Sequence, residues 1–425
     1  MAGLGGLAAA AAPLLAACGS SAGGASGSSA GTGGASASEL LSILGISKSE
    51  VAGGTSFPLG AVLPLTGPGS FYGKVQGNGL KLAVAHIKAA GGPDFQVNFQ
   101  DNKSGDAQAG VSAVRQLGSA GVQACLSSYV GDIGAMLPGV AQYKMLTLDG
   151  GGGTSDFAQA QPYFWGMKAI EPDDYYIGAV KYWQAKNPSV KRVYLVALDQ
   201  GKINAVVQAN FVKALATAGM KLAGFEATPI GTTDFSTTIS HLKAASPDAV
   251  FTFLVGLDSG YFMKDFVAAG LSLPVIGAEY TTDALKVSAG AYDHFMFSTD
   301  WFDPKTQVNP LARYFVKSYV KAYGEQPDYY AANYYEDTLA LWDLIRRVKV
   351  KGGDPNSGTN LQNALTASPV FKSVYGGDTA TVGTLTLNLK THSVATRPLS
   401  VVACAGSTVK TVATYQLGGA DFKLA

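Results

Sequence analysis

The stretch FPLGAVLPLTGPGSFYGKVQGNGLKLAVAHIKAAGGPDFQVNFQD, residues 57–101, decides the expected fold. Its first apolar run, 57–65, has the length and the flanking turn residues of a buried strand. Apolar residues then recur at helical spacing over 80–87, and the Ala-Gly-Gly-Pro at 90–93 ends that helix, because proline cannot continue it. A second strand follows at 95–99. The stretch therefore predicts a βαβ unit with parallel strands and a right-handed crossover.

The same alternation of strand and helix continues along most of the chain. Four predicted helices end in Ala-Gly just before another apolar run, at 90–91, 120–121, 218–219 and 269–270. Strands that alternate with helices of this length indicate parallel α/β sheets in both halves. Ligands bind beyond the carboxyl ends of such strands, so the loops there are expected to line a cleft. Beyond residue 371, alternating segments predict antiparallel edge strands.

Length and charge limit the classes of protein to which the chain can belong. A chain of 425 residues is long enough for two or more domains with sizeable cores. Its net charge is +1, and only 14% of its residues are charged, against about 25% in typical globular proteins. Because there is no basic field, we expect no nucleic-acid partner.

The first residues have the composition of an export signal. Residues 1–17 are rich in alanine and leucine and lead to Leu-Ala-Ala-Cys, followed by Gly-Ser. This resembles a bacterial lipobox, which predicts a signal peptide at 1–18, lipidation of Cys18 and a lipid anchor. No Lys or Arg precedes Cys18, and a flexible alanine-rich leader is the alternative. Residues 19–56 are expected to form a flexible Gly/Ser/Ala tether.

The sequence contains no convincing enzyme, metal or cofactor motif. Two Gly-x-Ser-x-Gly matches fall within the tether, where the strand and helix of a nucleophile elbow are not expected. The four histidines lack paired ligand spacing, and the Gly-Lys at 201–202 lacks the rest of a phosphate loop. We therefore expect neither catalysis nor a metal nor another cofactor. Cys125 and Cys404 are expected to be buried free thiols, with a disulfide as the alternative.

Several short motifs resemble the leucine/isoleucine/valine-binding-protein family, whose members are periplasmic or lipoprotein solute receptors of ABC importers. The motifs are PLTG at 64–67, Tyr72-Gly73, Gln76, Gly79, LAV at 82–84 and AAGG at 89–92. The resemblance implies a two-lobed type I periplasmic-binding-protein fold, in which each lobe is a mainly parallel sheet flanked by helices. Three crossings, expected near residues 170, 299 and 371, would divide the chain into 57–170 plus 299–370 and 171–298 plus 371–425.

The resemblance also implies a ligand site. Ser128 and Thr154 each follow a strand, and Ser and Thr at these places in the family bind the ligand's carboxylate; Tyr129 lies beside Ser128. Helix capping is the alternative role for both hydroxyls. Tyr72 matches a tyrosine that lines the cleft, or is an exposed loop aromatic. Glu279 matches an acid that binds the amino acid's ammonium, or is a solvated surface residue.

Two features depart from the family pattern. Asp199 keeps an acidic residue after the strand at 192–198, but Ile203 stands where the family has tyrosine. Both are kept as candidate ligand residues, and an aromatic expected near 255–258 is missing. The aromatic residues of 329–342 are expected to form core or inter-lobe packing rather than ligand contacts.

The resulting expectation is an extracytoplasmic, lipid-anchored binding protein of an ABC importer. It would capture a small amino acid or a related carboxylate or amide between two closing lobes and present it to a membrane permease. A membrane-tethered sensor domain of a signalling system is the main alternative. A cell-surface α/β enzyme is a weaker one, because no nucleophile and base are placed together.

Overall fold

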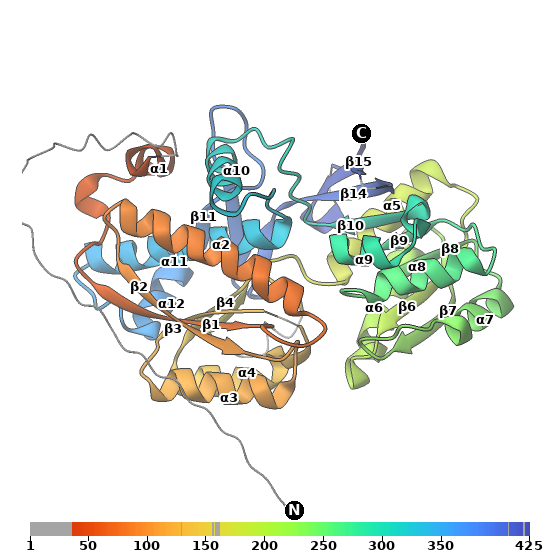
Figure 1. The fold of residues 1–425 in the computed structure, drawn as a ribbon, viewed down its shortest axis with the longest axis horizontal. Coiled ribbons are helices and arrows are strands. Elements are labelled where there is room, and N and C mark those ends of the chain that lie inside the picture. Colours follow the sequence, from red (N-terminus) through yellow and green to blue (C-terminus); the bar gives the residue numbers. More distant parts are fainter. Residues whose placement is uncertain (1–35, 129, 155–156, 158–161, 407, 420) are drawn as a thin grey trace, which may run out of the picture. The chain divides into compact units, whose positions relative to one another are not determined.

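The computed structural model describes residues 36–425 except 129, 155–156, 158–161, 407 and 420 (Figure 1). The predicted signal peptide, with Cys18, and the candidate ligand residue Tyr129 therefore lie outside the described residues. Within the described part of the chain, no helix is both long and apolar enough to cross a membrane.

The first sheet has five parallel strands in the order β2-β1-β3-β4-β5. The stretch that opens the predicted fold forms its centre, because β1 pairs with both β2 and β3. The strands are β1 (Ser56–Leu63), β2 (Asp94–Asp101), β3 (Ala124–Ser127), β4 (Leu146–Asp149) and β5 (Phe164–Gly166).

Helices cover both faces of this sheet (Figure 1). Alternate side chains of β1 point to opposite faces: Leu59 and Ala61 join one apolar cluster, while Val62 joins another. The first cluster includes α2 (Ser70–Ala89) and α11 (Tyr329–Val350), and the second includes α3 (Ala107–Ser119) and α4 (Val130–Tyr143). Gly79 lets α2 approach α11 closely, since a Cβ there would lie 2.1 Å from the carbonyl oxygen of Ala331. We call the elements around this sheet the first lobe.

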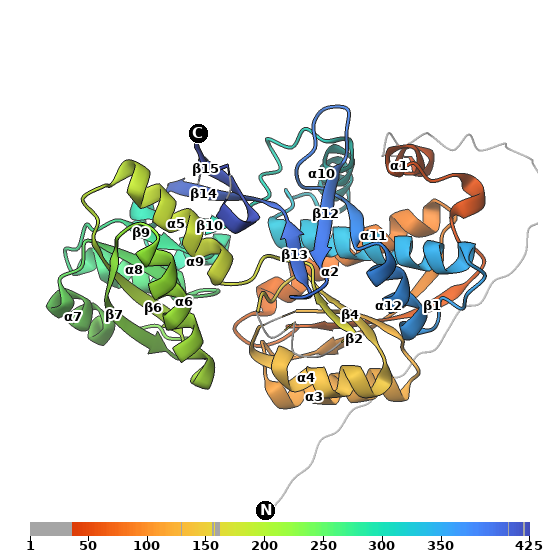
Figure 2. The ribbon, with the colours of Figure 1, turned by 180° about the vertical axis from the view of Figure 1, so that it is seen from behind.

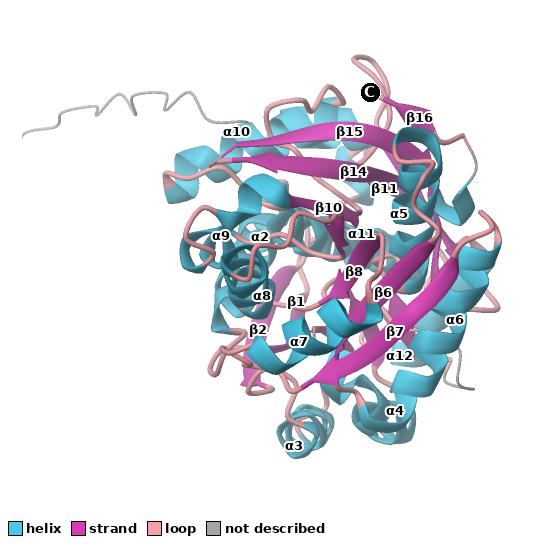
Figure 3. Cartoon of the chain, turned by 90° about the vertical axis from the view of Figure 1, so that its right-hand side faces the viewer, coloured by secondary structure: helices cyan, strands magenta, loops and turns pink. Residues whose placement is uncertain are grey.

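The second sheet has the order β16-β15-β14-β10-β9-β8-β6-β7. Its five strands from β10 to β7 are parallel, and β14, β15 and β16 extend it in antiparallel fashion (Figure 3). The strands are β6 (Arg192–Leu198), β7 (Lys221–Thr228), β8 (Ala249–Phe253), β9 (Val275–Gly277), β10 (Phe295–Thr299), β14 (Pro398–Ala405), β15 (Thr408–Gln416) and β16 (Lys423–Leu424).

Two apolar clusters cover the faces of the second sheet. Val193 and Leu195 of β6 point into one cluster, and Tyr194 and Val196 point into the other. The helices of this second lobe are α5 (Asp173–Lys186), α6 (Asn204–Ala216), α7 (Ser236–Ala245), α8 (Asp258–Ala268), α9 (Thr282–Val287), and the 3₁₀ turns η3 (Gly201–Ile203), η4 (Ala291–His294) and η5 (Leu417–Gly419). The expected α/β architecture of two mainly parallel sheets flanked by helices is confirmed.

The third crossing between the lobes comes later than residue 371. Strands β11 (Val370–Ser373), β12 (Gly383–Asn388) and β13 (Ser393–Thr396) form a separate antiparallel sheet (Figure 2). Phe371, Leu385 and Val394 pack into the core of the first lobe, together with residues of α10 (Pro310–Tyr323) and α12 (Gly358–Ala367). The chain therefore passes to the second sheet between β13 and β14, and the boundary predicted at 371 is wrong. The antiparallel character of these late strands is as predicted.

The segment predicted as a tether contains regular structure from residue 37 onward. Residues 37–44 form α1 (Ala37–Leu44), and η1 (Lys48–Glu50) follows it. Ser36 and Glu39 cap the start of α1 reciprocally, while Leu40 and Leu41 are buried in the core of the first lobe. The tether predicted over 19–56 is therefore too long, because its end contains apolar side chains that pack. Cys125 and Cys404 are both buried and free, as expected.

Candidate functional site

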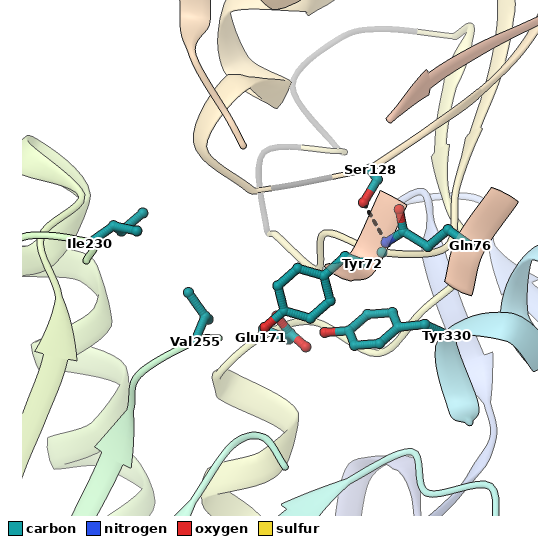
Figure 4. A pocket seen from close by; sticks show the side chains of 8 residues that line it. Tyr72, Gln76, Ser128, Glu171, Ile230, Val255 and Tyr330 are labelled. Atoms are coloured by element: carbon teal, nitrogen blue, oxygen red, sulfur yellow. Dashed lines mark hydrogen bonds between the residues drawn. The ribbon is translucent and has the colours of Figure 1, made fainter. Parts of the chain in front are cut away.

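A cavity lies where loops of the two lobes meet (Figure 4). The empty space between its lining atoms amounts to about 370 Å³, part of which is open to solvent. Most of its walls follow the carboxyl ends of parallel strands, which is where open α/β sheets place ligands. Its lining residues are Tyr72, Gln76, Ser128, Gly151, Glu171, Ile230, Val255 and Tyr330.

The polar end of the cavity is built on the first lobe. Ser128 directly follows β3, is 1% exposed, and accepts a hydrogen bond of 2.7 Å at Oγ from Nε2 of Gln76 on α2. The side chain of Asn102 holds the same loop by donating to the carbonyl oxygen of Ser128 at 2.6 Å. Oε1 of Gln76 is buried and has no hydrogen-bond partner among the described residues. The pair thus offers a ligand one hydroxyl donor and one carbonyl acceptor.

Gly151 lets the neighbouring loop close over this polar end. It follows β4, and the carboxylate of Asp149 holds the loop by accepting hydrogen bonds from the N–H groups of Gly151 and Gly152, at 3.1 and 2.6 Å. Burial raises the pKa of Asp149 to about 7. A Cβ at position 151 would lie 2.4 Å from Oγ of Ser128. Only glycine leaves the space beside Ser128 open.

Two tyrosines connect the cavity to Glu279. The hydroxyl of Tyr72 donates to Oε1 of Glu279 at 2.5 Å and accepts from the N–H of Gly256 at 2.6 Å. The hydroxyl of Tyr330 also donates to Oε1 of Glu279, at 3.2 Å. The two rings meet edge to face, with centroids 5.0 Å apart. Because Tyr72 and Tyr330 belong to the first lobe and Glu279 follows β9, these hydrogen bonds join the lobes.

Glu279 lies behind the cavity wall rather than on it. Its side chain is buried, and it is not among the described residues that line the cavity. Burial raises the pKa of Glu279, while the hydrogen bond from Tyr72 and the charge of Lys168 oppose that rise. The acid that does line the cavity is Glu171, on the segment between β5 and α5, and it forms an ion pair with the buried Lys168.

The second lobe contributes apolar side chains. Ile230 follows β7 and Val255 follows β8, and Figure 4 shows both facing Tyr72 from the opposite side. The carboxylate of Asp258 holds the Ile230 loop by accepting a hydrogen bond of 2.9 Å from the N–H of Gly231.

Two candidates in the second lobe lie away from this cavity. The carboxylate of Asp199 is exposed and accepts hydrogen bonds from the N–H of Gly201 and from Nδ2 of Asn204, at 2.9 and 2.7 Å. Ile203 ends the following 3₁₀ turn and packs against the core of its own lobe. Neither residue is among those that line the cavity, and their role in ligand binding stays a prediction. Local turn geometry accounts for the position of Asp199.

The remaining sequence-based predictions have mixed outcomes. Tyr72 and Ser128 line the cavity, whereas Thr154 is buried in the loop after β4 and is not among the described lining residues. The aromatic residues of α11 were expected to form core or inter-lobe packing rather than ligand contacts; Tyr330 contacts Glu279 of the other lobe and also lines the cavity. Glu171, Gln76 and the apolar wall were not predicted as site residues, although Gln76 belongs to the motif that carries the resemblance.

No group of three or more His, Cys, Asp or Glu among the described residues is arranged to hold a metal ion.

Comparison with known proteins identifies the family. The family described as periplasmic binding protein matches residues 56–407, which is most of the chain. The chain belongs to the periplasmic binding protein family. It is therefore a solute-binding protein rather than an enzyme.

Distant relatives and solved structures agree with this family. A Leu/Ile/Val-binding protein homolog of Brucella melitensis is 23% identical over 328 residues, covering 75% of this chain and 84% of the relative. A solute-binding protein of R. palustris in complex with benzoate superposes with a TM-score of 0.72 at 18% identity, covering 84% of this chain and 95% of the other. A branched-chain amino acid binding protein of Streptococcus pneumoniae in complex with isoleucine gives 0.71 at 18% identity, covering 84% and 98%. At these identities, the structural matches establish the shared fold.

Proposed function

We propose that this periplasmic binding protein is the extracytoplasmic, lipid-anchored receptor of an ABC importer. It captures a small amino acid or a related carboxylate or amide between its two lobes and delivers it to a membrane permease. The observation that carries the proposal is the cavity, whose walls come from both lobes and contain a buried polar end together with tyrosine rings. A concave, largely apolar site with a few placed polar groups suits a small organic ligand.

The contacts between the lobes support binding by closure. Tyr72 of the first lobe reaches both Gly256 and Glu279 of the second. Such hydrogen bonds form only when the lobes are close, and a ligand that fills the cavity stabilises the arrangement in which they form. Closure also removes water from the site, which strengthens each remaining polar contact. Ser128 and Gln76 then orient the ligand's polar group, and Tyr72 and Tyr330 pack against its body.

A thermal-shift screen of the full chain tests the proposed function. The panel contains branched-chain and aromatic amino acids, aliphatic and aromatic carboxylates, amides and urea. A ligand present at a hundredfold excess over its Kd adds about 2.7 kcal/mol to the free energy of unfolding, which shifts the melting temperature by several degrees. We expect at least one of these classes to stabilise the protein. A panel in which no compound does so would refute a role in small-solute capture.

The predicted anchor has its own test. Wild-type chain expressed in a bacterium should sediment with membranes, and Cys18→Ser should release it into the soluble extracytoplasmic fraction. A Cys125→Ser variant is the matched control, because that thiol is buried in the first lobe and no role in anchoring is expected. Recovery of the wild-type chain in the soluble fraction would refute the anchor without affecting the proposed ligand binding.

A further inference from the structure

A buried lysine lies directly behind the cavity wall. The side chain of Lys168, on the segment between β5 and α5, is 0% exposed, and its Nζ forms an ion pair with Glu171. The side chain of Glu171 is 8% exposed and lines the cavity. A buried ammonium persists only where carboxylates or aromatic rings compensate for the loss of water.

Three tyrosine rings surround the same ammonium. Nζ of Lys168 lies 5.0 Å from the ring centroid of Tyr330, 5.6 Å from that of Tyr329 and 5.7 Å from that of Tyr175. Tyrosine faces attract cations at these distances. Tyr330 also lines the cavity and donates a hydrogen bond to Glu279. A carboxylate together with tyrosine rings is the environment that the ammonium of an amino-acid ligand would need, and here a side chain of the protein occupies it.

The acids around the site are already engaged. Glu279 accepts hydrogen bonds from Tyr72 and Tyr330, and Lys168 is the nearby cation that opposes the effect of burial on its pKa. Asp300 accepts hydrogen bonds from the guanidinium of Arg397 at 3.0 Å and from the hydroxyl of Tyr175 at 2.8 Å. A ligand ammonium would therefore find Glu171 in an ion pair and Glu279 and Asp300 already hydrogen-bonded, and it would be repelled by Lys168.

We propose that Lys168 is a built-in counter-ion for Glu171 and Glu279, and that the cavity consequently selects small organic acids and amides that lack an ammonium group. This inference rests on the proposed function and narrows its ligand class. Lys168 acts as a positioning residue, since it sets the charge of the site through Glu171 and Glu279 without lining the cavity. The opposite end agrees with this selection, because the Gln76–Ser128 pair provides a donor and an acceptor but no acid for an ammonium.

Matched ligand pairs test the inference on the full wild-type chain. L-leucine and 4-methylpentanoate differ only in the α-amino group, as do phenylglycine and phenylacetate. Calorimetric titration should show that the amine-free member of at least one pair binds at least about tenfold more tightly than its amino counterpart, because a second cation close to Lys168 is repelled. If a pair binds and its amino acid binds as tightly as or more tightly than the amine-free counterpart, the inference is refuted and the proposed function stays intact. Absence of binding by all four compounds refutes the inference, and only failure of the whole screening panel refutes the proposed function.

A double variant provides a readout that a purely structural role of Lys168 would not alter. Lys168→Met with Glu171→Gln removes both charges of the ion pair and leaves Glu279 without its cation. We expect the affinity ratio of leucine to 4-methylpentanoate to rise at least about tenfold. Lys286→Met, at an exposed lysine of α9, is the matched control and should leave the ratio unchanged. An unchanged ratio in a folded double variant refutes the inference, and if that variant does not fold, the wild-type ligand pairs decide.

Discussion

The two walls of the cavity differ in chemistry. The wall from the first lobe is polar. Gln76 and Ser128 hydrogen-bond to each other, and Tyr72 and Tyr330 both donate to Glu279. The wall from the second lobe contains Ile230 and Val255, and the polar candidate Asp199 is engaged in a turn elsewhere. The acid that lines the cavity, Glu171, lies on the segment that connects β5 to α5 and is paired with Lys168. The difference indicates a division of roles: the first lobe recognises the ligand's polar group, and the second covers it and removes water.

The division has a structural reason. α2 and the loops after β3 and β4 converge on the same edge of the first sheet, so that side chains from three segments can hydrogen-bond to one another. The second lobe lines the cavity through two loop residues, and Glu279, behind the wall, accepts hydrogen bonds from the tyrosines of the first lobe. Changes to the first wall should therefore affect affinity more than changes to the second.

The largest effect is expected from Gly151→Ala. The added Cβ would lie 2.4 Å from Oγ of Ser128 and 2.7 Å from Nε2 of Gln76, and would fill the polar end of the cavity. Because overpacking costs roughly 1–3 kcal/mol, affinity for the ligand found by screening should fall about tenfold to a hundredfold. Gly77→Ala on α2 is the control, since its Cβ would meet only a Phe99 atom at 3.9 Å. Unaltered affinity in Gly151→Ala would place the ligand's polar group elsewhere.

A loss of similar size is expected from Tyr72→Phe, which tests the connection between the walls. The change removes a hydroxyl that donates to Glu279 and accepts from the N–H of Gly256. Hydrogen bonds to charged groups contribute about 1.5–3 kcal/mol, so affinity should fall at least about tenfold in titration. The matched control is Tyr323→Phe, because the hydroxyl of Tyr323 donates a hydrogen bond of 2.9 Å to the carbonyl oxygen of Asn78 within the first lobe. Equal effects of the two variants would contradict a role of Tyr72 in joining the lobes.

Val255→Ala tests the covering role of the second wall. The change removes two partly buried methyl groups. The expected loss of binding free energy is about 1 kcal/mol, or roughly a fivefold rise in Kd. Val206→Ala, at a 49% exposed position of α6, is the same substitution outside the cavity and should not alter binding. A loss as large as that of Gly151→Ala would show that both walls recognise the ligand equally.

The smallest effect is expected from Asp199→Asn. Hydrogen bonds from the N–H of Gly201 and from Asn204 hold the pKa of the exposed Asp199 carboxyl below its usual value, and none of these groups lines the cavity. Affinity should change by less than about twofold, as for most surface substitutions away from a site. A loss of affinity greater than fivefold in the same titration would show that Asp199 contacts the ligand and that the second wall also has a polar group.

The sequence allowed prediction of the parts of the site that depend on local pattern. Ser128 was predicted because it follows a strand of a parallel sheet, where the carboxyl-end rule places ligand loops. Tyr72 was predicted because it matches a tyrosine of the family that the sequence resembles. Asp199 also follows a strand, but its carboxylate forms local hydrogen bonds with the turn that follows it and is not among the residues that line the cavity. The sequence pattern also could not assign β11–β13 to a lobe, because alternating apolar residues indicate a strand but not the sheet or core that the strand joins.

The amino-acid sequence by itself determined the α/β alternation and the strand ends that carry the site, whereas the free state of the two described cysteines was settled by the structure. Only the tertiary structure brought Lys168, Glu279 and Tyr330 together, because these residues lie far apart in the chain and meet only when segments of both lobes fold against one another. Charge neutralisation inside a cavity depends on such distances in space, which no local pattern of residues encodes.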